Sequence, residues 1–146
     1  MNAPTQTLDI EATLGRKLPF ARHLGIRLVA LGEGTARLAL DARPELLNSW
    51  DAVHGGATMT LLDIALAVAL RSLDAEKRGA ITVELKVNFV GSGTGTLYAD
   101  GRCVHRGQTI AFCEGAAHDA AGKLVATASG TFMLRREPTA KGSPSG

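Results

Sequence analysis

The sequence has few aromatic residues and no excess of one charge. Phe, Trp and Tyr make up 4% of its 146 residues, which argues against a platform on which single-stranded bases would stack. The sixteen Lys and Arg residues, against fourteen Asp and Glu, leave a net charge of +2 and are scattered along the chain. Binding to a phosphate backbone needs these cations gathered into a patch or stripe. We therefore expect no nucleic-acid partner.

Cysteine is also scarce, with only Cys103 and Cys113. They form no CxxC pair, and no histidine stands near them at zinc-ligand spacing. Neither a redox motif nor a metal site is therefore predicted, and no cofactor is expected. Both cysteines are interpreted as small buried apolar residues.

Long hydrophobic segments are missing as well. The N-terminus, MNAPTQTLDIEATLG, lacks the basic start and the continuous apolar stretch of a signal peptide. The apolar run at 57–70 is too short and too interrupted to span a bilayer. We expect a cytoplasmic protein with no membrane partner.

The chain has the composition of one globular domain, with 45% hydrophobic and 21% charged residues. We predict an N-terminal segment at 1–19 that is partly flexible, a single domain at 20–136, and a disordered tail at 137–146. Apolar residues on either side of the turn GEGT predict a β-hairpin at 26–40. The Ala-, Leu- and Met-rich segment 57–72 predicts a helix of about four turns.

After this helix the hydrophobic period changes to two, as in a half-buried strand. Three further β-like runs follow at about 96–105, 108–118 and 123–135. A helix that is apolar nearly all round must be covered on most sides, and a curved sheet is the available partner. We predict an α+β fold in which an antiparallel sheet of five to six strands wraps one long helix. In the strand directly after the helix, one face is expected to carry Val83, Leu85, Val87 and Phe89.

Asp63 is the only acid inside the apolar helix. It lies too far from the start of the helix to cap it or to complement the helix dipole. One interpretation is a solvated carboxylate, or one bonded to a backbone group at a subunit contact. The other is a nucleophile or general base, made more basic by partial burial.

The sequence His54-Gly55-Gly56 stands where this helix begins. Helix N-termini present free N–H groups with partial positive charge, and glycines let a ligand approach the backbone closely. A carbonyl oxygen that becomes negative during acyl transfer would be stabilised there. A plain loop-to-helix turn is the alternative.

With Asn48, these glycines, Asp63 and the four-strand tail considered together, the chain resembles the hotdog-fold acyl-CoA thioesterases of the phenylacetate-pathway type. The resemblance runs from about Phe20 to Leu134, and it includes VHRG at 104–107 and KLVATASGTFML at 123–134. It implies a homo-oligomer, in which dimers pair their sheets edge to edge, share active sites at the interface and associate into a tetramer.

The resemblance also implies a role for each matching residue. Asp63 would be the nucleophile or general base, and the Gly55 N–H would polarise the thioester carbonyl. Asn48 would help to place the water or the carboxylate, His54 would lie near the sulfur, and Thr82 would supply a hydroxyl. For coenzyme A, which belongs to the substrate, the candidate contacts are Gly56, Arg106 and Gly107, with Arg102 as a weaker candidate. A solvated hairpin turn is the alternative reading of Arg106 and Gly107.

One position departs from the family pattern. Asp51 stands where the family often has glycine, which puts the local loop conformation in question, and Trp50 beside it either lines the acyl pocket or holds the loop. We expect hydrolysis of an acyl- or aryl-CoA thioester. A non-catalytic acyl-CoA-binding protein and a hotdog hydratase are the alternatives.

Overall fold

The computed structural model describes residues 7–136 as three α-helices, one short 3-10 helix and six strands. In chain order these are α1 (Ile10–Leu14), α2 (Pro19–Leu24), β1 (Arg27–Leu31), β2 (Thr35–Asp41), η1 (Pro44–Leu46), α3 (Gly55–Arg71), β3 (Gly79–Phe89), β4 (Thr96–Arg106), β5 (Ile110–Asp119) and β6 (Leu124–Arg135). None of the helices in this part of the chain has both the length and the apolar character that a membrane span needs.

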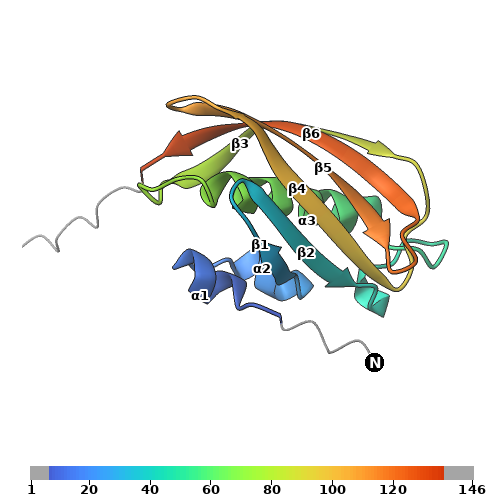
Figure 1. Ribbon diagram of the computed structural model, residues 1–146. Helices are drawn as coiled ribbons and strands as arrows, with labels where there is room; N and C mark the ends of the chain where they lie inside the picture. The colour runs from blue at the N-terminus through green and yellow to red at the C-terminus, as the bar shows by residue number, and fades with distance from the viewer. Residues whose placement is uncertain (1–6, 137–146) are drawn as a thin grey trace, which may run out of the picture.

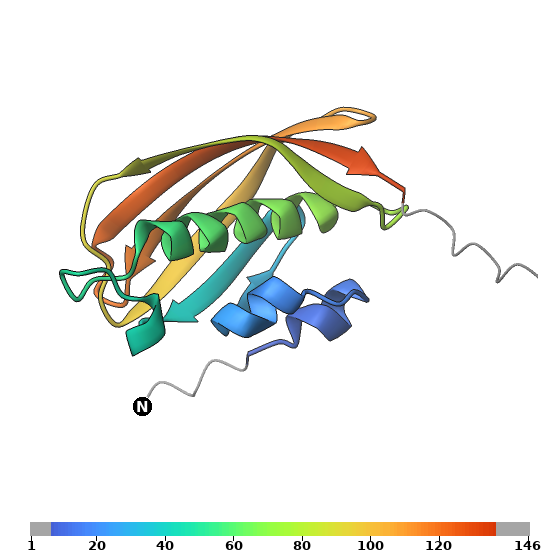
Figure 2. The same ribbon diagram turned by 180° about the vertical axis from the view of Figure 1, so that it is seen from behind.

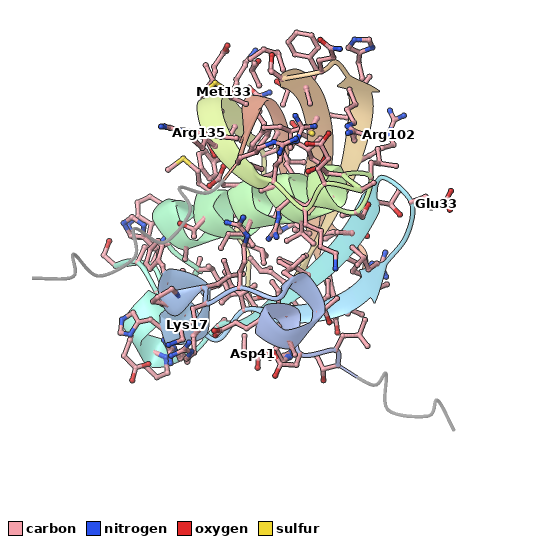
Figure 3. All side chains as sticks on the ribbon, turned by 90° about the vertical axis from the view of Figure 1, so that its left-hand side faces the viewer. Lys17, Glu33, Asp41, Arg102, Met133 and Arg135 are labelled. Carbon is pink, nitrogen blue, oxygen red and sulfur yellow. The ribbon has the colours of Figure 1, made fainter. Side chains whose placement is uncertain are left out.

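The six strands form one antiparallel sheet in the order β1-β2-β4-β5-β6-β3. The sheet curves around α3, as Figure 1 shows, and α1 and α2 lie on the other side of this helix (Figure 2). Seen from the side, α3 is enclosed between these two layers (Figure 3). The predicted α+β fold, with one long helix wrapped by a curved antiparallel sheet, is confirmed.

Two glycines let α3 lie directly against the sheet. A Cβ atom on Gly101 of β4 would stand 2.6 Å from the carbonyl oxygen of Ala65, and one on Gly115 of β5 would stand 2.9 Å from a methyl carbon of Leu66. The contact with Ala65 cannot be relieved without a shift of the helix backbone, whereas the contact with Leu66 requires that side chain to move. The middle of α3 is therefore held at a fixed height on the sheet, and the position of Asp63 follows from it.

The strand β3 lies at an edge of the sheet and is only partly covered. It pairs with β6 on one side, and most of its residues are exposed. The expected face pattern is wrong at its start, because a bulge lies between Thr82 and Glu84. Thr82 stands opposite Phe132, which is fully buried, so Thr82 faces α3, whereas Val83 is 59% exposed. Beyond the bulge Leu85 and Val87 pack against the core as predicted.

The other predicted elements agree with the structure to within a few residues. The hairpin at 26–40 is β1 and β2, and the three later runs are β4, β5 and β6. The helix begins two residues earlier than predicted, at Gly55. The boundary at residue 20 stays a prediction, and the expected disordered tail at 137–146 lies outside the described residues.

Candidate active site

The start of α3 is capped by His54. The Nδ1 atom of His54 accepts a hydrogen bond of 2.9 Å from the N–H of Gly56, so this N–H is not available to a ligand. The carbonyl oxygen of His54 accepts the N–H groups of Ala57 and Thr58. The N–H of Gly55, the first residue of the helix, has no acceptor among residues 7–136. It is the free donor at the positive end of the helix dipole.

Phe89, the last residue of β3, lies beside Gly55. A Cβ atom on Gly55 would be 3.3 Å from the Cε1 atom of Phe89, and the phenyl ring is itself 53% exposed. An apolar ring therefore borders the backbone of Gly55.

The carboxylate of Asp63 lies on the same helix, two turns further on. It is half-buried, and its Oδ1 atom accepts a hydrogen bond of 2.7 Å from the hydroxyl of Thr82. The bulge in β3 turns Thr82 toward the helix and so makes this contact. The structure thus brings together two of the residues that the sequence predicts for the site.

The loop before α3 is held by Asn48. Its Oδ1 atom accepts the N–H groups of Trp50 at 2.9 Å and of Ala52 at 3.1 Å, which leaves only the amide nitrogen for a ligand. Asp51 has a φ of 56°, the left-handed conformation that glycine adopts most readily and that Asp tolerates. The loop therefore keeps a glycine-like backbone at the position where the sequence departs from the family pattern. Trp50 is 85% exposed, so packing of its ring does not hold the loop.

The five predicted catalytic residues form two groups in one protomer. Asn48, His54 and Gly55 lie at the start of α3, and Asp63 and Thr82 lie beside its middle. Gly55 and Asp63 are eight positions apart in the helix, so their backbones are about 12 Å apart along the helix axis. If one carbonyl group accepted a hydrogen bond from the Gly55 N–H and were attacked by Asp63, the two groups would be within about 7 Å of each other. With a water molecule between Asp63 and the carbonyl group, the separation would be about 10 Å.

Arg106 and Gly107 lie beyond the other end of α3, in the β4–β5 turn. Arg106 donates to the carbonyl oxygen of Leu73 and to Asp74, and its side chain is 33% exposed. The N–H of Gly107 is bonded within the turn, to the carbonyl oxygen of Ile110. The turn borders a hollow of about 560 Å³ whose lining includes three arginines, Arg78, Arg106 and Arg136, and one acid, Glu76.

Asp74 beneath this hollow has a fully buried side chain, which the sequence analysis missed. It accepts the backbone N–H of Arg78 at 2.6 Å and guanidinium groups from Arg78 and Arg106. Burial disfavours its charge, but the hydrogen bonds from Arg78 and the charges of both arginines outweigh burial, so the pKa of Asp74 lies below its usual value. The spacing of Asp74 and Arg78, four residues apart, is the only signal in the sequence.

The two cysteines are direct cross-strand partners on β4 and β5. Cys113 is buried as predicted, whereas Cys103 is half-buried, and neither forms a disulfide. Burial raises the pKa of the Cys113 thiol to about 12, and the neighbouring Cys103 adds to the effect. Within residues 7–136 no three His, Cys, Asp or Glu side chains converge in a way that could hold a metal ion.

A second hollow, of about 1080 Å³, lies elsewhere. Its polar and charged lining residues include Arg37, Asp100, Arg102 and Glu114, which pair across strands on the face of the sheet turned away from α3. Of the predicted residues it contains only the weak candidate Arg102, whose guanidinium is bonded to Glu114. The catalytic candidates therefore do not lie at this hollow.

Comparison with known proteins assigns the class. The sequence profile of the thioesterase superfamily matches residues 51–126, which include the start of α3, Asp63 and Thr82. The protein named "Putative esterase Rv1847" of Mycobacterium tuberculosis is 35% identical over 104 residues, 68% of this chain and 74% of its own. The acyl-coenzyme A thioesterase PaaI of Escherichia coli is 32% identical over 90 residues, 60% of this chain and 62% of its own.

Solved structures agree with this assignment. A thioesterase family protein from Silicibacter pomeroyi superposes with a TM-score of 0.80 at 27% identity, covering 87% of this chain and 96% of its own. The structure of E. coli PaaI superposes with a TM-score of 0.77 at 24% identity, covering 84% of this chain and 88% of its own, and shows the same fold. The chain belongs to the thioesterase superfamily, with the hotdog fold, and it is a thioester hydrolase.

Proposed function

We propose that the protein hydrolyses an acyl- or aryl-CoA thioester to the free acid and CoA, with Asp63 as nucleophile or general base and the Gly55 N–H as oxyanion donor. The observation that carries the proposal is the hydrogen bond from Thr82 of β3 to Asp63 of α3, a helix whose first N–H has no acceptor among residues 7–136. The likeness to E. coli PaaI, which is named for its action on acyl-coenzyme A, supports this substrate class.

The chemistry needs only these groups and water. With Asp63 as base, a water molecule gives it a proton and attacks the thioester carbon, and the carbonyl oxygen becomes an anion held by the Gly55 N–H. The carbon–sulfur bond then breaks, and the sulfur leaves as thiolate and receives the proton that Asp63 took from water. His54, whose Nδ1 is fixed by Gly56, has its Nε2 free to lie near that sulfur. With Asp63 as nucleophile, its carboxylate attacks the thioester carbon and CoA leaves as thiolate, which gives a mixed anhydride that water then cleaves to the free acid and the restored carboxylate.

We further propose that each active site is shared by two protomers. Gly55 and Asp63 of one chain are about 12 Å apart along the helix, too far to act on the same carbonyl group, so the Gly55 of one protomer would work with the Asp63 of its partner. The edge strand β3, exposed and unpaired on one side among the described residues, supports an edge-to-edge dimer. Association of such dimers into a tetramer belongs to the same proposal.

The nucleotide of CoA is proposed to lie against the basic hollow beside Arg106 and Gly107. This hollow begins at Arg78, four residues before Thr82, which is about 13 Å along an extended strand. The pantetheine arm of CoA joins a thioester to phosphates over a comparable length. The guanidinium group of Arg106 already donates hydrogen bonds to Leu73 and Asp74. Arg106 is therefore proposed to contribute less to the binding of the CoA nucleotide than an unpaired arginine would.

The test is a panel of CoA thioesters, from short and long fatty acyl to phenylacetyl, benzoyl and hydroxybenzoyl, with thiol release followed by a chromogenic reagent. Wild type is expected to hydrolyse some of them. Asp63→Asn should lose about 10²- to 10⁴-fold in turnover with little change in melting temperature, since the amide oxygen can still accept from Thr82. Unchanged turnover in the variant would contradict the assigned role. If wild type binds the esters, as shown by a raised melting temperature, but hydrolyses none, the protein is a binding protein.

A further inference from the structure

Met59 is the only large apolar side chain of α3 that is exposed within the described residues, at 41%. The rest of the helix buries its large apolar side chains against the sheet and the segment α1–α2. Residues four apart share one face of a helix. Gly55, Met59 and Asp63 therefore stand in one row, with Met59 halfway between the free N–H and the carboxylate.

If the active site is shared as the proposed function states, Met59 lies on the two-fold axis of the dimer. Each carbonyl group would contact Gly55 of one protomer and the partner's Asp63, and two such sites exist in a two-fold dimer. The two helices then run antiparallel between the same two points. Their midpoints coincide, and the midpoint of 55 and 63 is residue 59.

We propose that Met59 and the partner's Met59 meet at the two-fold axis and form the wall between the two active sites. Met59 is thereby a specificity-determining residue. Its distance from each carbonyl group, four helical residues, is about 6 Å along the axis. Methionine suits such a place because its flexible apolar side chain adapts to different neighbours.

The acyl group is the part of the substrate that reaches this wall. The basic hollow proposed for the nucleotide lies beyond Asp63 on the side of Arg71, the end of α3 that is remote from Met59. CoA therefore leaves the carbonyl site in that direction, and the acyl group points toward the axis. With the wall at about 6 Å, compact acyl groups fit and long chains do not.

The first experiment tests the axis. Met59→Cys should give a covalent dimer on a non-reducing gel after treatment with copper–phenanthroline. Ala67→Cys is the matched control, because it lies on the same row of α3 but about 24 Å along the axis from its own symmetry mate. Wild type, which carries Cys103 and Cys113, sets the background. A cross-link at 59 that is absent at 67 is expected. No cross-link at 59 in a protein that elutes as a dimer would overturn the proposal.

The second experiment tests the wall. In Met59→Ala the ratio of kcat/KM for a long acyl-CoA to that for a short one should rise at least about tenfold, whereas Met59→Leu should keep the wild-type ratio. Leu8→Ala, which shortens an exposed side chain beside β1 at the opposite edge, should also leave it unchanged. An unchanged ratio in Met59→Ala, with Asp63→Asn still inactive, rejects the wall and leaves the proposed function standing. Absence of hydrolysis in wild type rejects both.

Discussion

Replacing Gly55 by proline removes one N–H group from the proposed active site and leaves the helix intact. Gly55 is the first residue of α3, where proline is well tolerated because its missing N–H would have no partner within the helix. The preceding residue, His54, has φ −57° and ψ 136°, the extended conformation that a following proline favours. The added Cβ meets only the edge of the Phe89 ring, at 3.3 Å, and this side chain can move.

Gly55→Ala is the matched control, because it adds the same Cβ atom and keeps the N–H. If this N–H holds the developing oxyanion, Gly55→Pro should lose about 10²- to 10³-fold in kcat. Gly55→Ala should stay within about tenfold of wild type, since it introduces only the contact with Phe89. The melting temperatures of both variants are expected to lie within about 4 °C of wild type. The assay is thiol release from the best CoA ester of the panel.

Mixing two inactive variants then tests whether the site is shared. In a dimer of one Gly55→Pro chain and one Asp63→Asn chain, one site receives both substitutions and the other receives neither. Random pairing of equal amounts, by unfolding and refolding the mixture, makes about half of the dimers mixed, so about a quarter of the wild-type activity should return.

A site contained within one protomer gives a different result, because each chain would then carry one defect and no activity could return. That outcome would refute the shared site, and with it the position assigned to Met59. Equal activity of Gly55→Pro and Gly55→Ala would instead refute the oxyanion role of the N–H, and the Met59→Cys cross-link would then be the test of how the two helices meet.

Three further predictions concern groups outside this pair. Asp74→Asn should lower the free energy of unfolding by about 3 kcal/mol at pH 7, because two arginines lose a buried charged partner. The pKa of Asp74 is lowered in the folded protein. The difference from wild type, measured by urea denaturation, should therefore shrink as the pH falls below about 4. Asp51→Gly should raise the free energy of unfolding by up to about 1 kcal/mol by relieving a positive φ, and an equal or lower urea midpoint would contradict this. With a pKa of about 12, Cys113 should resist iodoacetamide at pH 8 in the folded protein and react after unfolding, as mass spectrometry can show.

The sequence predicts the elements of this fold well because each one has a local cause. The Gly-rich turn separates β1 from β2, the Ala- and Leu-rich run forms α3, and the change of hydrophobic period marks the start of β3. The resemblance names both Asp63 and Thr82 as site residues, but their hydrogen bond is seen only in the structure. Periodicity alone places Thr82 on the wrong face of its strand.

The remaining features depend on contacts between distant segments. The bulge after Thr82 is a choice of register between β3 and β6, and a single residue inserted there changes the face of every residue before it. For Arg106 the sequence predicts either a contact with coenzyme A or a solvated hairpin arginine, and neither includes the bond to Asp74, 32 residues away, that the structure shows. The pairing of Cys103 with Cys113 likewise needs the register of β4 against β5.

Asp74 and Asp63 show that burial alone does not identify the acid with a functional role. Asp74 has the more buried carboxylate, yet backbone and guanidinium donors from two arginines satisfy it, so its surroundings explain it as a structural residue. Asp63 is half-buried and has one hydrogen-bond donor among residues 7–136. It shares its helical row with an N–H that has no acceptor in that part of the chain and with an exposed methionine. Each of the three is incomplete in one protomer, and one antiparallel approach of a second α3 would supply a neighbour to all of them.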